Sequence, residues 1–419
     1  MTVNDSFQAP ETLVTLDQAL DILAERLRPV TAVEMVPTML AERRVLAEDV
    51  VSGIDAPPFA CSAMDGFAFR FADLPAPGAA AALTVTARIA AGHAHESAFG
   101  PGEAARIFTG AAMPPGLDTV VMQEDCRTTD ALLHLPAGSR QGDFVRPRGD
   151  DFAIGTTVLA AGRRLRPQDV AMAAAVGRDS LSVHARLRVG VFSTGDEVVE
   201  PGRPLPVGAI YNCNRRGVAA LCAGMGCVVE DLGNIPDRLE ETVARLEAAA
   251  GRCDLLITTG GVSVGGEDHV RAAVERLGAI HLWRLAVKPG KPTAFGHVGN
   301  VPFVGLPGYP VSALVTFMLI ARPVILLLAG AVAEPMRPPR YPLPAAFSFD
   351  KDHPRRQFVR VSLRTGQDGR PELTLYRSQE PNVLSSLVNS DGLVDLAEDL
   401  RRVRPGDLVD YIPYAALQW

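Results

Sequence analysis

The feature that most constrains the fold is a regular alternation of apolar strands and amphipathic helices in the second half of the chain. The runs RLRVGVFSTGDE, CVVEDLG and CDLLITTGGVS have the character of buried strands, while GVAALCAGMG, DRLEETVARLEAAAG and EDHVRAAVERLG have helical spacing. This alternation predicts a doubly wound α/β domain with a mostly parallel sheet. Ligands of such sheets bind at the carboxyl ends of the strands, where STGDE, TTGGVS and VGLPGYP fall.

The rest of the chain predicts further domains, because 419 residues exceed what one hydrophobic core usually holds. Apolar residues recur at helical spacing in residues 16–27 and 39–47, so we expect a helix in each. From Gly53 to about Gly142 the chain is rich in Gly, Ala and Pro, and its short runs LTVTARI and DTVVMQ predict a β-rich insert. Beyond the Pro-rich EPMRPPRYPLP, short strands separated by turns predict a small β-barrel.

Composition excludes several classes of protein. A net charge of −7 argues against a protein that coats nucleic acid, which needs a basic face. The first twenty residues lack the basic and apolar segments of a signal peptide, and the six cysteines form no CxxC pair, so we expect a reduced, cytoplasmic protein. The apolar run 311–332 contains Arg322 and Pro323, which favours a buried core helix over a membrane span.

Lysine is rare in this chain, and its placement is informative. Of the 41 basic residues only three are lysines, and two of them, Lys288 and Lys291, lie in the loop VKPGKPTAF. A lysine ammonium binds phosphate and other oxyanions as a compact point charge, whereas arginine presents a planar fork. The loop is therefore a candidate oxyanion site, and a solvated loop without a ligand is the alternative.

Three glycine-rich turns follow strands of the predicted α/β domain. In the first, the hydroxyls of Ser193 and Thr194 and the backbone beside Gly195 are suited to an anion, and Glu197 to a metal or a polar ring. In the second, paired glycines allow close approach of a ligand; its candidates are Thr259, Gly260, Gly261 and Ser263. In the third, a helix N-terminus follows a rigid Pro-Gly turn; its candidates are Pro307, Gly308 and Ser312.

Three motifs in the first 152 residues complete the pattern. PPFACSAMDGFAFR contains Asp65, RIFTGAAMPPGLDTVVMQED contains Thr109, and VRPRGDDF contains Asp151. Carboxylates beside hydroxyls suit an oxygen-binding cation such as Mg²⁺, although each motif is also compatible with an ordinary turn.

Taken together and in this order, these motifs resemble those of the molybdopterin molybdenumtransferase family, which includes bacterial MoeA and the gephyrin E domain. The resemblance runs from about residue 16 to residue 413. It implies an elongated homodimer, with each active site shared between the α/β domain of one subunit and the β-rich insert of the other. It also implies four domains: a helical linker domain (8–54 and 144–184), the β-rich insert (55–143), the α/β molybdopterin-binding domain (185–332) and the C-terminal β-barrel (338–416).

The resemblance implies the reaction as well. Adenylylated molybdopterin and molybdate bind, the adenylyl phosphoanhydride is hydrolysed, and molybdenum enters the dithiolene with release of AMP. The residues that match the family's catalytic positions are Asp65, Thr109, Asp151, Glu197, Asp237, Asp268 and Lys288. Of these, Glu197 and Asp237 suit Mg²⁺ or a ribose-type pair of hydroxyls, while Lys288 with Lys291 and Arg284 would neutralise phosphate and molybdate.

Two positions depart from the family pattern: Tyr309 stands where asparagine is usual, and Arg284 where many relatives have lysine. His269 is expected to be a polar residue at a helix start. Ser385 and Ser386 resemble a serine pair in the family's barrel loop, which is expected to approach the partner's site.

Two other functions are compatible with parts of the sequence. A molybdopterin adenylyltransferase shares the α/β fold, but it resembles a single domain with a TGGTG loop. A non-catalytic pterin carrier or scaffold would not need the full set of acidic residues. The resemblance implies two partners, the upstream adenylyltransferase and molybdoenzyme maturation proteins, and neither nucleic acid nor a membrane. The residues do not separate molybdate from tungstate.

Overall fold

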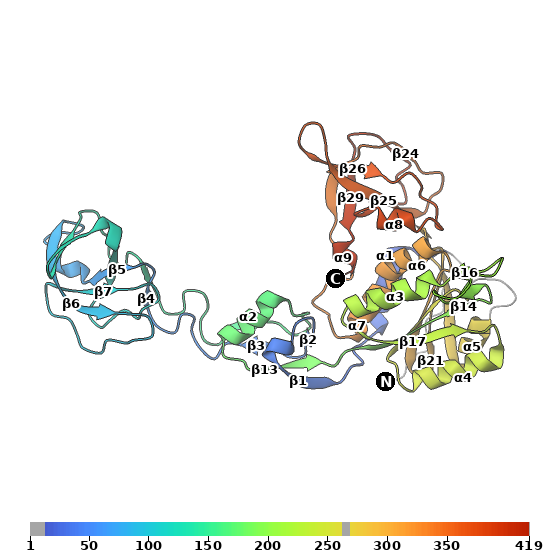
Figure 1. Cartoon of the computed structure of the whole chain (residues 1–419), viewed down its shortest axis with the longest axis horizontal. Coiled ribbons are helices and arrows are strands. Elements are labelled where there is room, and N and C mark those ends of the chain that lie inside the picture. The colour runs from blue at the N-terminus through green and yellow to red at the C-terminus, as the bar shows by residue number, and fades with distance from the viewer. Residues whose placement is uncertain (1–12, 262–268, 419) are drawn as a thin grey trace. The chain divides into compact units, whose positions relative to one another are not determined.

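The computed structural model describes residues 13–261 and 269–418, and the chain divides into two compact units (Figure 1). Unit 1 consists of the chain up to Glu48, residues 161–167, and everything from Ser180 onward. Unit 2 consists of Asp49–Ala160 and Gln168–Asp179. Each unit is described by itself below.

A six-stranded mixed sheet lies at the centre of unit 1, in the order β17-β14-β18-β22-β21-β19. The first four strands are parallel, as predicted, and the last two are antiparallel to their neighbours. A tight turn with Gly299 in the left-handed region (φ 58°) joins β21 to β22, which is typical of a β-hairpin. The strands are β14 (Arg188–Thr194), β17 (Val228–Ile235), β18 (Leu255–Thr259), β19 (Gly278–Arg284), β21 (Pro292–Val298) and β22 (Val301–Leu306).

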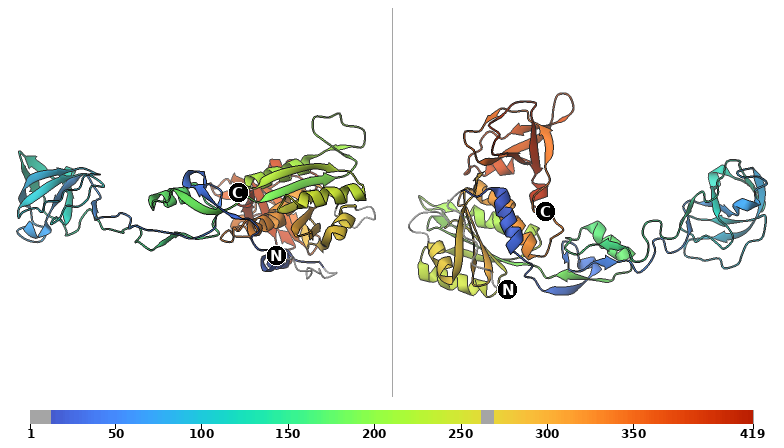
Figure 2. Two further views of the ribbon diagram at one scale, coloured as in Figure 1. Left: turned by 90° about the horizontal axis from the view of Figure 1, so that it is seen from below. Right: turned by 180° about the vertical axis from the view of Figure 1, so that it is seen from behind.

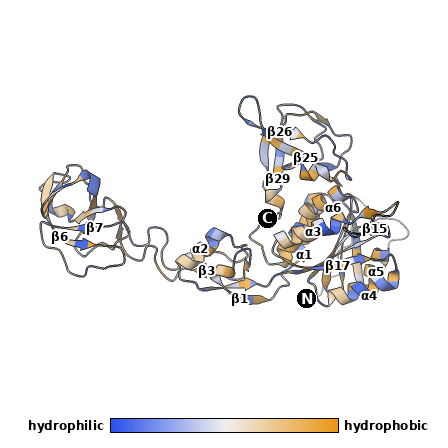
Figure 3. Cartoon of the chain, in the orientation of Figure 1, coloured by the Kyte–Doolittle hydropathy of each residue, from blue (hydrophilic) through white to orange (hydrophobic). Residues whose placement is uncertain are grey.

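Helices cover both faces of this sheet (Figure 2). Successive residues of a strand point to opposite faces, so Val191 packs in one core and Phe192 in the other. Figure 3 shows polar and apolar residues interleaved along α4 and α5, as expected for helices with one exposed face. One core includes α1 (Leu16–Arg26), α3 (Cys213–Gly224), α6 (Pro310–Thr316) and α7 (Arg322–Leu328); the other includes α4 (Leu239–Ala250) and α5 (His269–Leu277).

The predicted core helix is confirmed. Within the described residues, Pro310–Leu328 is the one helix long and apolar enough to cross a membrane, and 89% of its most apolar window is buried inside the molecule. Its Arg322 is also buried, and its guanidinium donates to the carbonyl oxygens of Pro335 and Met336 at 3.1 and 3.4 Å. The charge is therefore accommodated by backbone acceptors.

The helix predicted over residues 39–47 is wrong. Thr38–Leu40 (η1) forms a single 3₁₀ turn, Arg43 has a φ of 62°, and Val45–Leu46 is a strand (β2). A left-handed residue cannot continue a helix, and the amide of Arg43 donates instead to the carbonyl of Leu165 at 2.7 Å. The region predicted as a helical linker thus contains more strand than expected, since β1 (Val33–Pro37), β13 (Ser180–His184) and β2 form a three-stranded sheet.

The C-terminal part of unit 1 is a second β-rich body. Its strands follow the order β20-β25-β27-β29-β23, with β26 paired to β25, and a bridge joins Ala345, directly after β23, to Leu373 of β26. Further strands β24 (Phe349–Asp350) and β28 (Arg402–Val403) pair with each other. The bounds are β20 (Val287–Lys288), β23 (Tyr341–Pro344), β25 (Arg356–Thr365), β26 (Pro371–Leu375), β27 (Gly392–Leu396) and β29 (Leu408–Pro413).

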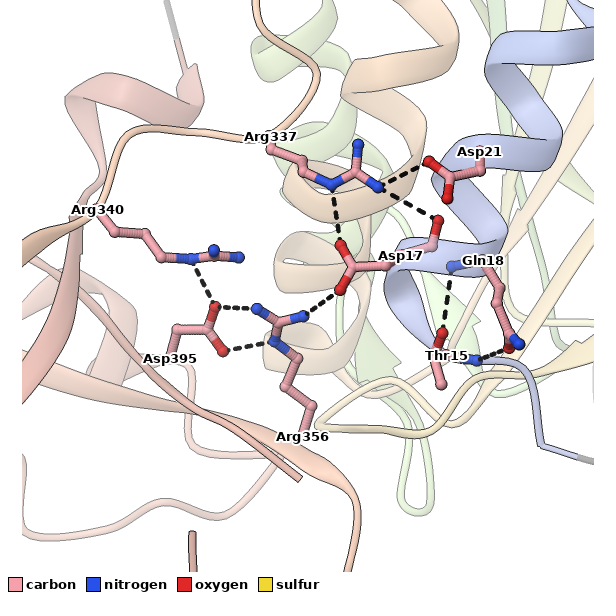
Figure 4. A network of polar contacts seen from close by, with 8 residues as sticks. All are labelled: Thr15, Asp17, Gln18, Asp21, Arg337, Arg340, Arg356 and Asp395. Atoms are coloured by element: carbon pink, nitrogen blue, oxygen red, sulfur yellow. Dashed lines mark hydrogen bonds and ion pairs between the residues drawn. The ribbon is translucent and has the colours of Figure 1, made fainter. Parts of the chain in front are cut away.

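Ion pairs fasten this body to α1 (Figure 4). Arg356 donates to both carboxylate oxygens of Asp395 at 2.7 and 2.8 Å, and to Asp17 of α1 at 3.0 Å. Arg337 donates to Asp17 at 2.9 Å and to Asp21 at 2.8 Å. Both arginines therefore bind Asp17 of α1, which lies more than 300 positions before them in the sequence.

Unit 2 contains a six-stranded sheet in the order β8-β5-β7-β6-β10-β9, with a small apolar core on each face. The predicted runs LTVTARI and DTVVMQ lie in β6 and β8, so the prediction of strands here is confirmed. A short helix, α2 (Pro167–Ala175), follows. The strands of the sheet are β5 (Gly66–Phe69), β6 (Ala81–Ile89), β7 (Glu103–Ile107), β8 (Thr119–Met122), β9 (Arg127–Thr129) and β10 (Leu132–Leu135); β4 (Cys61–Ser62) with β11 (Val145–Arg146), and β3 (Val50–Val51) with β12 (Thr157–Leu159), form separate pairs.

Candidate functional site

A cavity of about 1030 Å³ lies in unit 1, where β14, β18 and β22 end. Its size is at the upper end of the range for pockets that bind small molecules, and this edge of a parallel sheet is where such ligands bind. The predicted residues that line it are Ser193, Thr194, Gly195, Glu197, Asp237, Thr259, Gly260, Gly261, Pro307, Gly308 and Ser312. The three glycine-rich turns identified in the sequence therefore line the same cavity.

The first turn is shaped by Gly195. Its φ is +125°, and a Cβ on it would lie 2.6 Å from Oε2 of Glu197, so the Glu197 carboxylate folds back over the glycine. Behind the turn, Ser193 Oγ donates to Asn234 Oδ1 at 3.0 Å and accepts from Asn212 Nδ2 at 2.7 Å. The Asn234 amide group in turn donates to the Gly195 carbonyl at 3.0 Å. These bonds hold the turn in place, so Ser193 is part of its frame.

The second turn leaves no room for a side chain at Gly261. Gly260 and Gly261 have φ values of +90° and +67°, and a Cβ on Gly261 would lie 2.7 Å from Val270 and 2.8 Å from Thr194 Oγ1. Just before them, Thr259 is 3% exposed, and its hydroxyl has no hydrogen-bond partner within the part of the chain that the structure describes. A buried polar atom normally has a partner, so this hydroxyl in the cavity wall is available to a ligand.

The third turn packs against the second. A Cβ on Gly308 would lie 4.0 Å from the Cα of Gly260, and the Gly308 carbonyl accepts from Asn214 Nδ2 at 2.6 Å. Tyr309 is the N-cap of α6 and is 61% exposed at the cavity. Its side chain makes no capping hydrogen bond with the described residues, unlike a typical polar cap.

The C-terminal β-rich body also contributes to the cavity. The amide of Val311 donates to the Pro381 carbonyl at 3.0 Å, which brings Asn382 and Leu384 into the wall. The serine pair that follows faces other groups: Ser386 is buried and accepts from Arg360 Nε at 3.1 Å, and Ser385 accepts from the Tyr376 hydroxyl.

Sequence reasoning missed part of the wall. Asn212 and Asn214 had a recognisable signal, because asparagine before a helix is a common N-cap, and Asn212 does accept from the Arg215 amide at 3.3 Å. His269 begins α5 as predicted, but it also lines the cavity. Asn382 and Leu384 had no signal, since only the folded chain brings them to this edge.

Two of the predicted basic residues, Arg284 and Lys291, lie next to a residue of the cavity wall. Pro292 lines it, follows Lys291 directly and pairs in register with Arg284, and both of these basic side chains are exposed. Lys288 is half-buried on β20, next to β25. Burial, and after it the charges of Arg355 and Lys288, lowers the pKa of His353.

Unit 2 holds the other predicted residues. The Thr109 amide and hydroxyl both donate to Asp65 Oδ1, each at 2.8 Å. These bonds, from the amide first and the hydroxyl second, lower the pKa of the Asp65 carboxyl. The sequence therefore singled out two residues that form one pair. Asp151 lies on an exposed turn, where its amide donates to the Ala56 carbonyl at 2.9 Å.

The remaining predicted residues concern metal binding and the second turn. Asp268 and Ser263 lie outside the described residues. Glu197 and Asp237 both line the cavity, but no group of three or more His, Cys, Asp or Glu side chains able to hold an ion occurs in residues 13–261 and 269–418. Mg²⁺ commonly takes one or two carboxylates and completes its shell with water and substrate phosphate. The residues present fit that mode.

Known protein families match most of the chain. Consecutive parts of the chain match models of the MoeA N-terminal region (domains I and II, residues 14–177), a probable molybdopterin binding domain (190–326) and the MoeA C-terminal region (domain IV, 342–414). The chain is 36% identical over 403 residues to a molybdopterin molybdenumtransferase of Haemophilus influenzae, covering 96% of this chain and 99% of that one. It is 32% identical over 382 residues to that of Bacillus subtilis, covering 88% of this chain and 87% of that one.

Solved structures give the same result. A molybdopterin biosynthesis MoeA protein of Pyrococcus horikoshii superposes with a TM-score of 0.80 at 27% identity, and the match covers 96% of this chain and all of that one.

Proposed function

The chain belongs to the molybdopterin molybdenumtransferase (MoeA) family, and we propose that it carries out that family's reaction as a transferase of molybdenum cofactor biosynthesis. In this reaction molybdenum from molybdate enters the dithiolene of adenylylated molybdopterin, and AMP is released as the phosphoanhydride is hydrolysed. The observation that carries the proposal is the cavity wall of three glycine-rich turns, which exposes backbone and hydroxyl groups to an anionic ligand.

Charge near the cavity supports an anionic substrate. Molybdate is a dianion and the adenylyl group carries phosphate, so both need positive charge close by. Arg284 and Lys291, beside the lining residue Pro292, provide it at the cavity, and Lys288 provides it in the same loop. When Mg²⁺ is bound by Glu197 and Asp237, it would neutralise phosphate charge.

We propose that Asp65 and Thr109 act from the partner subunit of a homodimer. An apolar surface on unit 1 supports a dimer, since Val33, Met35, Met39 and Leu40 are 57–84% exposed. Four large apolar side chains so close in sequence favour a protein–protein interface. We further propose that the enzyme is cytoplasmic and receives its substrate from the adenylyltransferase, and that it passes its product to molybdoenzyme maturation proteins.

The test is AMP release from adenylylated molybdopterin on addition of molybdate and Mg²⁺. We expect release that requires molybdate, and we expect Asp65→Ala and Lys288→Ala to abolish it. Asp368→Ala, on the exposed turn between β25 and β26, is the matched control and should behave as the parent protein.

The same assay separates the alternatives. Tight binding without AMP release, unchanged in both variants, would show a pterin carrier or scaffold. Adenylylation of molybdopterin by ATP in the absence of molybdate would show the adenylyltransferase.

A further inference from the structure

Arg106 of β7 joins the two chain segments that carry Asp65 and Thr109. Its Nη1 donates to the carbonyl of Gly66 at 2.9 Å, and its Nη2 donates to the side-chain oxygen of Gln123. The backbone amide of Gln123 donates to the Asp65 carbonyl at 3.1 Å. One guanidinium group therefore binds the backbone of Gly66, next to Asp65, and the side chain of Gln123, whose backbone amide binds Asp65.

The flat guanidinium also contacts the neighbours of both residues of the pair. Its Cζ lies 5.0 Å from the ring centroid of Phe67 and 4.8 Å from that of Phe108. Phe67 comes two positions after Asp65, and Phe108 comes directly before Thr109. A cation within about 6 Å of a ring centroid is attracted to the ring. Arg106 is thus bound to the Asp65 segment and to the Thr109 segment at once.

The pair that it holds presents one free acceptor. Both Thr109 donors bind Oδ1 of Asp65, and Oδ2 has no partner among residues that the structure describes. The next residue, Gly110, would have open space around a Cβ, with no described atom within 4 Å. The charged groups that act on Asp65 here are Arg106, which favours its ionised form, and Glu124, which opposes it.

We propose that Arg106 is a positioning residue, which holds Asp65 and Thr109 as one oriented unit with Asp65 Oδ2 turned to the substrate. This inference rests on the proposed function, in which Asp65 acts on the substrate. Arg106 reaches the reaction through the pair and makes no contact with substrate.

Arg88 is a matched control. Its Cζ lies 4.6 Å from the centroid of the same Phe108 ring, so it shares one of Arg106's contacts. It is exposed, and in the described part of the chain it donates no hydrogen bond to the Asp65 or Thr109 segment. Arg88→Gln therefore removes a similar charge from the same ring and leaves the proposed link intact.

The experiment uses the full chain with Arg106→Gln, Arg106→Lys and Arg88→Gln. Hydrogen exchange of the Thr109 amide reports the pair directly, because that amide donates to Asp65. We expect Arg106→Gln to speed this exchange and to lower kcat for AMP release by about ten- to a hundredfold, as a small misplacement of a catalytic group does, with KM nearly unchanged. In the pH profile of kcat for this variant, the fall in activity at acid pH should begin at a higher pH than in the parent. The reason is that loss of the Arg106 charge raises the pKa of Asp65.

Arg106→Lys keeps the positive charge but loses the planar guanidinium that binds two acceptors. The acid side of its pH profile should therefore match that of the parent, while kcat falls. Arg88→Gln should match the parent in every readout. The proposal is overturned if Arg106→Gln leaves the Thr109 exchange rate unchanged, or if Arg88→Gln has the same effects. If the parent chain releases no AMP, the proposed function fails, while the exchange measurement still decides whether Arg106 holds the pair.

Discussion

The cavity wall of unit 1 and the Asp65–Thr109 pair of unit 2 achieve their geometry in different ways. The wall depends on space: Gly195, Gly260 and Gly261 adopt positive φ values, and a Cβ on Gly195 or Gly261 would lie less than 3.0 Å from a neighbouring side chain. The pair depends on charge and hydrogen bonds; Gly110, after Thr109, lies in open space, whereas Gly66, after Asp65, packs against the Val121 backbone. The wall should therefore tolerate changes of charge better than added atoms, and the Thr109 side of the pair the reverse.

The largest expected effect is the loss of charge at the pair. Asp65→Asn keeps the size of the side chain, yet we expect kcat for AMP release to fall by about 10²–10⁴-fold, the contribution typical of an acid–base group. Affinity of the unit 1 cavity for AMP, measured by calorimetry, should stay the same. Glu124→Gln removes a neighbouring carboxylate and serves as the control; an equal loss there would mean that general negative charge, and not the pair, is required.

A smaller effect is expected from one added methyl group in the wall. Gly261→Ala puts a Cβ 2.7 Å from Val270 at a φ of +67°, so we expect a loss of about 1–3 kcal/mol in unfolding free energy, with weaker AMP binding. Gly202→Ala is the control, because its φ is +92° but no described atom lies within 4 Å of the added Cβ. Denaturant unfolding of both variants separates the effect of the collision from that of backbone strain. Equal losses of unfolding free energy in the two variants would show that the collision at Gly261 has no effect.

Sequence alone could predict what depends on local pattern. The strands and helices of the α/β domain follow from periodicity, and the glycine turns follow from their position after strands. The Asn212–Ser193–Asn234 frame could not be predicted, because its bonds join residues 19 and 41 positions apart. The sheet of β1, β2 and β13 was missed for the same reason, since Val33 pairs with His184.

Arg106 shows a different limit. Arginine makes up nearly all of the basic residues, so no single arginine stands out in the sequence. Its importance appears only when its fork and its two aromatic neighbours are seen together with Asp65.

Substitution of Tyr309 tests whether a side chain of the cavity wall, in addition to its backbone, binds the substrate. Its ring is exposed at the cavity, where a planar ring of the substrate could stack on it. Tyr309→Asn should then weaken substrate binding by about 0.5–1.5 kcal/mol, whereas Tyr309→Phe should not. KM values for the two variants measure this difference, and identical values would leave the ring without a role in binding.

The smallest effect is expected from the ion pairs that fasten the C-terminal body to α1. Burial alone would raise the pKa of Asp17, but hydrogen bonds from Arg337 and the charge of Arg356 outweigh it and lower the pKa below 3.8. A lowered folded pKa means that this stabilisation is present above about pH 4 and is lost as the pH falls through the folded value.

Asp17→Asn should therefore lower the unfolding free energy at pH 7 by less than about 1 kcal/mol, as for other half-exposed pairs, and should flatten its acid dependence. Thermal unfolding between pH 3 and 7 measures both. If the stability of the parent and that of the variant changed with pH in parallel, the ion pairs of Asp17 would not be the source of this acid dependence.

The central claim is that the wall of one subunit works with the pair of the other. Heterodimers with two different affinity tags, one subunit carrying Asp65→Asn and the other Glu197→Gln, test it most directly. If the site is shared, one of the two sites has both parental halves, and the purified heterodimer should release AMP at about half the parental rate. If each subunit uses its own pair, both sites are damaged, and the heterodimer would be no more active than either variant alone.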